Sequence, residues 1–266
     1  MAFQLNAVKS DAEAQQDVTD FAKNNDYELF VARERTMIEM IEPFCQMMLR
    51  HNTSDFHVFT EVFIKNDYAI LTQQYFGDDQ PHFIIDVGAN IGCATLYLRR
   101  FFPDAKYITI EASKSNFEAL ERNLSLNRCD NVKAINNAFW VNNDMLALGN
   151  SFRDGREWAF STRPLENKPE NTNIASDTTT VQGITLAQIL NDNQILEVDI
   201  LKIDIEGGEK WILEDKSTMQ LIKEKVKILL MEVHEDVISM ETAQNIMKEN
   251  DFNFVVEGAI IFARKK

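Results

Sequence analysis

The sequence predicts an α/β fold, in which a doubly wound, mostly parallel sheet is covered by helices on both faces. The composition is that of a globular chain, since 45% of the 266 residues are apolar and 26% are charged. After Pro81, short apolar segments alternate regularly with helix-like segments, which is the pattern of a parallel sheet. Residues 77–81 form a turn cluster and are the expected domain boundary. We therefore expect an N-terminal extension at 1–80 and a sheet domain at 81–266.

The N-terminal extension is expected to be helical over residues 1–50. Between Glu34 and Arg50 the apolar residues recur at spacings of three and four. These residues are Met37, Ile38, Ile41, Phe44, Cys45, Met48 and Leu49. From Phe56 to Phe76 apolar and polar residues alternate, which indicates either a short hairpin or a strand followed by a helix. We expect the extension to serve as a substrate cap or as a dimer element.

The sheet domain is expected to contain five strands, followed by a terminal pair of strands. The five strands are at 83–87, 107–110, 132–139, 200–203 and 226–233, and the pair lies within 252–262. Helices are expected at 94–102, 115–127, 184–190, 209–215 and 242–250. Residues 142–180 are polar and contain prolines, so we expect an irregular insertion there.

Charge and targeting signals narrow the classes of function. With 27 Lys and Arg against 42 Asp and Glu, the formal net charge is −15, which opposes binding to nucleic acid. The N-terminus does not resemble a signal peptide, and no apolar run approaches the ~20 residues that span a bilayer. The three cysteines, Cys45, Cys93 and Cys129, have no metal-type spacing. We therefore expect a reduced, cytoplasmic protein that binds neither nucleic acid nor a membrane.

The turn after the first strand has the composition of a ligand-binding turn. It reads Asp86-Val87-Gly88-Ala89-Asn90-Ile91-Gly92, and ligands of open parallel sheets bind at the carboxyl ends of strands. Gly88 permits a tight turn, and Gly92 opens the next helix where a side chain would block a ligand. Thr95 stands where the dinucleotide fingerprint requires a third glycine, so a nicotinamide oxidoreductase is disfavoured. Asp86 needs a partner, because an unpaired buried carboxylate is costly.

The second strand ends at Glu111, which is positioned to accept both hydroxyls of a ribose. The alternative is that Glu111 caps a helix or is solvated. Asn116 lies in the first turn of the following helix. It is expected either to reach the same ligand or to be an ordinary polar residue at a helix start, and the sequence does not separate the two.

Several motifs together resemble the FkbM-type methyltransferases, which are class I enzymes that use S-adenosyl-L-methionine. The motifs are Asp86 to Gly92, Phe102-Pro103, Glu111-Ala112 with Asn116-Phe117, Ala138-Phe139-Trp140, Leu201 to Gly207 with Glu209, and Glu232-Val233-His234. The resemblance covers about residues 63–262. It departs from the family pattern at Ala112, where many members have proline. It implies about seven strands, with the last one antiparallel.

The resemblance also implies roles for individual residues. Gly88, Asn90 and Gly92 would lie under the methionine and ribose parts of the cofactor, and Asn137 and Ala138 would flank the adenine unless they are an ordinary strand exit. The full set of expected cofactor-binding residues is Asp86, Gly88, Asn90, Gly92, Glu111, Asn116, Asn137, Ala138 and Asp204.

The fourth and fifth strands end in Asp204-x-Glu206 and Glu232-x-His234, so acids and an imidazole are expected near the transferred methyl group. The expected catalytic residues are Asp204, Glu206 and His234. His234 is the only histidine at a strand exit and is the candidate base, with a structural role as the alternative. The acids could bind a divalent cation, but no DxDxD-like cage is present and no metal is expected.

The leading hypothesis is O-methylation of a hydroxyl group on a small molecule or glycan. A protein that binds the cofactor without turnover, as a sensor or assembly module, is the alternative. The crowded acids and His234 favour an enzyme, since a pure binder needs no such groups. Methylation of RNA is opposed by the net charge of −15. A homodimer is left open.

Overall fold

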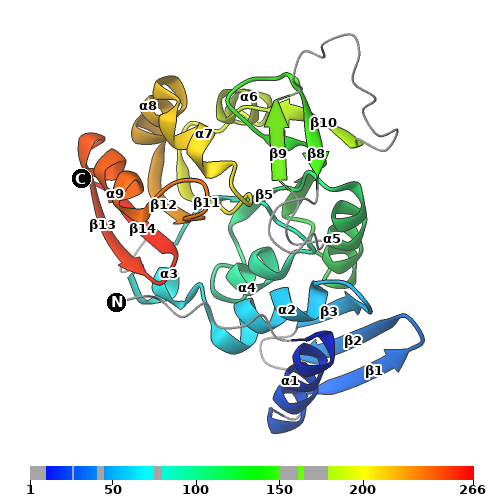
Figure 1. The fold of residues 1–266 in the computed structure, drawn as a ribbon. Coiled ribbons are helices and arrows are strands. Elements are labelled where there is room, and N and C mark those ends of the chain that lie inside the picture. Colours follow the sequence, from blue (N-terminus) through cyan, green and yellow to red (C-terminus); the bar gives the residue numbers. More distant parts are fainter. Residues whose placement is uncertain (1–9, 26, 41–44, 75–79, 150–160, 165–178) are drawn as a thin grey trace.

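The computed structural model describes residues 10–25, 27–40, 45–74, 80–149, 161–164 and 179–266, and it contains a seven-stranded central sheet (Figure 1). The strands lie in the order β13-β14-β12-β11-β4-β5-β6. Their bounds are β4 Phe83–Val87, β5 Lys106–Ile110, β6 Val132–Ile135, β11 Val198–Ile203, β12 Val226–Glu232, β13 Phe252–Glu257 and β14 Ile260–Lys265. Strands β4, β5, β6, β11 and β12 are parallel, whereas β14 runs antiparallel to β12. The predicted fold class is therefore confirmed.

Helices cover both faces of this sheet. One face packs against α4 (Cys93–Phe101) and α5 (Lys114–Leu126), and the other against α6 (Leu186–Asp192), α7 (Glu209–Glu214), α8 (Lys216–Lys225) and α9 (Met240–Glu249). Neighbouring residues of one strand alternate between the two cores, as Ile84 and Ile85 of β4 do. Because both faces are buried, the strands read as nearly continuous apolar runs.

The predicted helix between Glu34 and Arg50 is wrong. After α1 (Asp11–Asn24), the chain forms an antiparallel sheet of β1 (Glu28–Ala32), β2 (Arg35–Met40) and β3 (Cys45–Arg50). Burial alternates along β2 and β3, as strands require. The apolar residues of this stretch fit both periodicities. The sequence also has Pro43 between the strands, and proline disfavours a helix interior.

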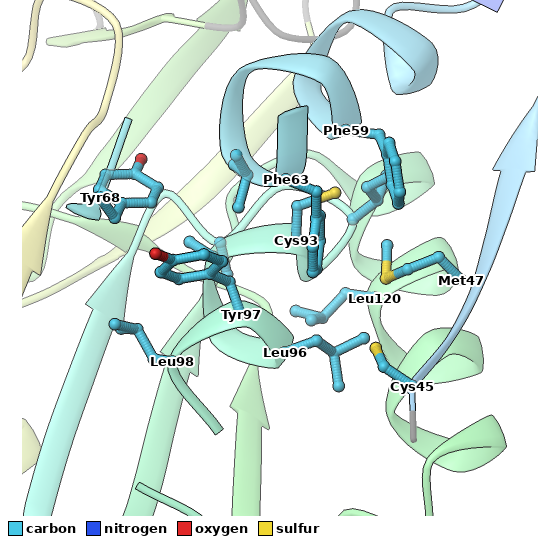
Figure 2. Packing of buried hydrophobic residues seen from close by; sticks show 14 of the residues in the cluster. Cys45, Met47, Phe59, Phe63, Tyr68, Cys93, Leu96, Tyr97, Leu98 and Leu120 are labelled. Atoms are coloured by element: carbon cyan, nitrogen blue, oxygen red, sulfur yellow. The ribbon is translucent and has the colours of Figure 1, made fainter. Parts of the chain in front are cut away.

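The hairpin or strand predicted within 56–76 is also wrong for the described residues, and only the helix of the strand–helix alternative is present; residues 75 and 76 lie outside the described residues. The chain there forms α2 (Asp55–Phe59), a π-helix η1 (Thr60–Lys65) and α3 (Ala69–Gln74). Phe59 and Phe63 are one helical turn apart and stack with ring centroids 4.7 Å apart. Figure 2 shows the Phe63 ring directed toward Tyr97 of α4, and these two rings pack edge to face with their centroids 5.9 Å apart. The N-terminal extension therefore shares one hydrophobic core with α4 and α5.

Asparagine side chains on one face of α5 bind the edge of β3. Asn123 accepts the backbone N–H of Met48 at 2.8 Å, and Asn127 accepts that of Gln46 at 2.8 Å. Asn123 also donates to the carbonyl of Ile91, in the turn after β4. These amides satisfy backbone groups that an open strand edge would leave unpaired.

We expect Asn123→Ala to lower the free energy of unfolding by about 1–3 kcal/mol, because it leaves buried backbone groups unsatisfied. Urea denaturation with a common slope for all variants is the measurement. Glu118→Ala, on an exposed position of the same helix, is the control and is expected to change little. Equal midpoints for the two variants would show that the α5–β3 contact contributes no stability.

The irregular insertion predicted at 142–180 is wrong for the part that the structure describes. A four-stranded sheet joins β7 (Ala138–Phe139), β10 (Thr179–Ile184), β8 (Met145–Gly149) and β9 (Ser161–Pro164) in that order. The third predicted strand, 132–139, is divided between β6 and β7. The rest of the insertion, at 150–160 and 165–178, lies outside the described residues.

No helix within the described parts of the chain combines the length and the apolar character that a membrane span needs.

Candidate active site

A cavity of about 530 Å³ lies at the carboxyl ends of the central strands, within the size range of small-molecule sites. Its wall includes Val87 at the end of β4, Glu111 after β5, Asp204 after β11 and Glu232 at the end of β12. Strand order reverses between β4 and β11, so the cavity is at the topological switch point of the sheet.

The turn after β4 is shaped by two glycines. Gly88 permits the tight turn that was predicted, whereas the reason for Gly92 differs from the predicted one. Gly88 has φ 72°, and a Cβ atom there would lie 1.6 Å from the carbonyl oxygen of Asp204. Gly92 has φ 94°, and its Cβ would lie 2.9 Å from Leu120 Cδ1. Gly88 lines the cavity but Gly92 does not. A side chain at either position would therefore meet the protein itself before it met a ligand.

Asn90 and Glu111 lie side by side on the cavity wall. Asn90 has φ 50°, and its buried side-chain oxygen has no hydrogen-bond partner among the described residues. Glu111 is 6% exposed and accepts the backbone N–H groups of Asn90 and Ser113, both at 2.8 Å. Burial raises the pKa of Glu111 to about 7, although these hydrogen bonds favour the charged form. The pair offers oxygen acceptors to a ligand with hydroxyl groups.

Asn116 also lines the cavity, and its orientation is set by the N-terminal extension. Arg50 donates to its side-chain oxygen at 2.8 Å and forms an ion pair with the buried Asp55, also at 2.8 Å. Sequence reasoning missed Arg50 and Asp55, which are distant from Asn116 in the chain. Asn137 and Ala138 also line the cavity.

Lys202 is a third residue that sequence reasoning missed. Its ammonium group is buried, 3.2 Å from Asp86 and 3.4 Å from Asp204, and it donates to the carbonyl of Gly88. Burial opposes the charge, but the two carboxylates raise the pKa of Lys202 above its ordinary value. Asp86 thus has the partner it was expected to need, and it also accepts the hydroxyl of Thr95. Asp86 does not line the cavity, so it stabilises the turn and does not contact a ligand in the cavity.

Carboxyl groups crowd the end of the cavity that faces β11 and β12. Those that line it are Glu61, Asp67, Asp204, Glu206, Glu232 and Asp236. Burial and repulsion by Asp204 raise the pKa of Glu232 to about 8, and burial raises that of Glu61 to about 7. The carboxyl groups of Glu232 and Glu61 therefore titrate near neutral pH.

His234 is buried next to this cluster and does not line the cavity. Its Nε2 lies 3.2 Å from Glu206 and its Nδ1 lies 3.1 Å from Glu209. Although burial disfavours the charge, the two neighbouring carboxylates raise the pKa of His234 to about 11. A histidine that is already protonated cannot accept a proton, so the geometry does not support His234 as the base.

Three side chains of this region have atoms that could bind a metal ion. They belong to Asp204, Glu206 and His234, and each offers an atom within 4.8 Å of the others. Each nitrogen of His234 already faces a carboxylate, however, so the arrangement is that of an ion-paired imidazolium.

The N-terminal extension contributes part of the cavity wall at its acidic end, but the sequence did not single out the residues that do so. Val58, Glu61, Val62, Asp67 and Tyr68 all line the wall. The hydroxyl of Tyr68 donates to Asp204 at 3.3 Å. Their position depends on packing against α4, which local sequence patterns do not reveal.

Comparisons with known proteins agree with this geometry. The family model described as the methyltransferase FkbM domain matches residues 86–255. Methyltransferase 1 of Beauveria bassiana (strain ARSEF 2860) is 27% identical over 209 residues, covering 74% of this chain and 80% of that protein. Methyltransferase sdnD of Sordaria araneosa is 30% identical over 168 residues, covering 54% of this chain and 64% of that protein.

A solved structure shares the fold. The methyltransferase FkbM from Methylobacillus flagellatus KT has a TM-score of 0.50 and 14% identity to this chain. The alignment covers 72% of this chain but only 45% of that one.

Proposed function

Because the chain belongs to the FkbM methyltransferase family, we propose that it transfers the methyl group of S-adenosylmethionine to a hydroxyl oxygen of a small molecule or glycan. The observation that supports this most directly is the cavity, in which a turn suited to a nucleoside meets a cluster of carboxyl groups. Family membership supports the cofactor class, and the carboxyl groups support the assignment to an oxygen acceptor.

The residues present fit the nucleoside part of the cofactor. Glu111 would hold the ribose hydroxyls, and Asn90, whose buried oxygen has no described partner, would accept a further hydrogen bond. Asn137 and Ala138 would flank the adenine. When bound, S-adenosylmethionine supplies an electrophilic methyl group on a positively charged sulfur, and an acidic surround favours that charge.

The acidic end would bind and deprotonate the acceptor. We assign the proton acceptor to Glu232, because it lines the cavity beside Asp204 and its pKa of about 8 suits a base near neutral pH. The hydroxyl proton would pass to Glu232 as the oxygen takes the methyl group. Asp204, fixed by Lys202 and Tyr68, would orient the acceptor for this attack.

We expect Glu111→Ala to weaken the binding of S-adenosylhomocysteine about tenfold to a hundredfold, since hydrogen bonds to a charged group are lost. Calorimetric titration is the measurement, and the unfolding midpoint reports whether the fold is retained. The control is Glu121→Ala on the exposed face of α5. A well-folded Glu111→Ala variant with unchanged affinity would remove Glu111 from the cofactor site.

Turnover separates an enzyme from a protein that only binds the cofactor. A panel of sugars, phenols and polyketide hydroxyls is incubated with S-adenosylmethionine, and the formation of S-adenosylhomocysteine is followed. Methylation at an oxygen supports the proposal. Tight binding without product across the panel would favour the sensor or assembly role.

A further inference from the structure

We propose that Glu209 is a positioning residue, which acts through an imidazolium of His234 that is ion-paired at both nitrogens to hold Asp204 and Glu206 at the methyl-transfer end of the cavity. The inference rests on the proposed function, and its test can fail independently of that function.

Glu209 organises the loop between β11 and α7. Its side chain is fully buried, and its two oxygens accept the backbone N–H groups of Ile205 at 2.7 Å and Gly207 at 2.8 Å. Glu206, which lies between these two residues, has φ 51°, and Gly207 itself has φ 92°. A left-handed conformation is unfavourable for a glutamate and persists only where the surroundings fix it. The Glu209 carboxylate provides that fixation, and the loop it shapes contains both Asp204 and Glu206.

His234 connects this loop to the turn after β12. Its Nδ1 lies 3.1 Å from the Glu209 oxygen that also accepts Ile205 N–H, and its Nε2 lies 3.2 Å from Glu206. Carboxylates are acceptors only, so two such neighbours require two N–H donors, which an imidazole has only when protonated. The ring of His234 is buried next to these carboxylates, so the imidazolium and the carboxylates stabilise one another. None of these charges would be stable there alone.

The charges that face His234 come from each neighbouring element. Glu206 and Asp204 belong to the loop after β11, Glu209 to α7, and Glu232, at 3.9 Å, to β12. The imidazolium thus offsets part of the negative charge at the acidic end and fixes where the remaining carboxylates lie. Glu209 lies behind the imidazole and does not line the cavity, so it acts only through these contacts.

The first test observes the protonation of His234 directly in the wild-type protein. The chain has four histidines, so nitrogen NMR of the imidazole rings can resolve each of them. We expect both nitrogens of one ring to remain protonated from pH 6 to pH 9, and His234→Gln assigns that ring. Titration of His234 near the ordinary value of about 6.5 would overturn the proposal.

The second test measures binding of S-adenosylmethionine and S-adenosylhomocysteine by calorimetry. S-adenosylmethionine carries a positively charged sulfur, whereas the sulfur of S-adenosylhomocysteine is neutral. If Glu209 positions carboxylates beside the sulfonium, Glu209→Gln should lower the affinity for S-adenosylmethionine about tenfold and that for S-adenosylhomocysteine less. A general loss of structure would weaken both ligands equally. Glu214→Gln, an exposed position of the same helix, is the control and should change neither affinity.

A double-mutant cycle tests the connection through His234. We expect the effects of Glu209→Gln and His234→Gln on the ratio of the two affinities to be strongly non-additive. Additive effects, or a ratio that Glu209→Gln leaves unchanged, would contradict the proposal. If Glu209→Gln does not fold, the NMR titration of the wild type decides. Failure of the wild type to bind either ligand would instead contradict the proposed function and leave the NMR result valid.

Discussion

Lys202→Met is expected to lower the free energy of unfolding by about 3–5 kcal/mol, the usual result of breaking a buried ion pair by removing one partner. The ammonium group is 3% exposed and its partner Asp86 is fully buried, so the substitution leaves a carboxylate uncompensated in the core. Urea denaturation, or the loss of soluble protein if the effect exceeds the total stability, measures the change.

Lys227→Met is the matched control. Lys227 also pairs with an aspartate, Asp199, at 2.7 Å, but half of the lysine side chain is exposed. Asp199 is buried and keeps the backbone N–H groups of His82 and Phe83 as donors when Lys227 is replaced. An ion pair with a solvated cation contributes at most about 1 kcal/mol, so this variant should remain close to the wild type. The double variant Lys202→Met with Asp86→Asn should recover part of the lost stability, because it removes the uncompensated charge. Equal losses for Lys202→Met and Lys227→Met would show that the buried pair contributes no special stability.

The sheet domain was predictable because its signals are local. Each strand is a short apolar run, and each site residue at the carboxyl end of a strand follows directly from that strand, as Gly88, Glu111 and Asp204 do. Parallel topology then brings these ends together without further information. The family motifs identified the same residues.

The N-terminal extension was not predictable, because its residues fit more than one periodicity. Ile38 and Leu49 fit a helix pattern by spacing, but pairing between β2 and β3 decides their structure, and that pairing is a tertiary interaction. The placement of Glu61 and Tyr68 on the cavity wall likewise depends on the packing of Phe59 and Phe63 against α4.

His234 shows a different limit. A histidine at a strand exit is a reasonable candidate base, and nothing in the sequence places Glu209 behind its ring. The buried contacts to Glu206 and Glu209 occupy both of its nitrogens and favour the protonated form, which cannot accept a proton. Glu232, which the sequence suggested only as a supporting acid, has the exposure and the pKa that the base requires.

Glu232→Gln is therefore expected to reduce turnover by about 10²–10⁴-fold, the range for a positioned acid–base group, with little change in the affinity for S-adenosylhomocysteine. A base must be deprotonated to act, and burial together with Asp204 raises the pKa of Glu232 to about 8. Wild-type turnover should thus rise with pH to a plateau above about pH 8, and Glu232→Gln should abolish that rise. Glu241→Gln, at an exposed position of α9, is the control and should keep the wild-type profile.

A wild-type rate that is independent of pH between 6 and 9, or a Glu232→Gln variant with full activity, would exclude Glu232 as the base. Proximity and orientation by Asp204 would then have to account for catalysis, which is chemically adequate for an acidic phenol but not for an unactivated sugar hydroxyl. The pH profile of Glu232→Gln therefore also distinguishes the two classes of acceptor.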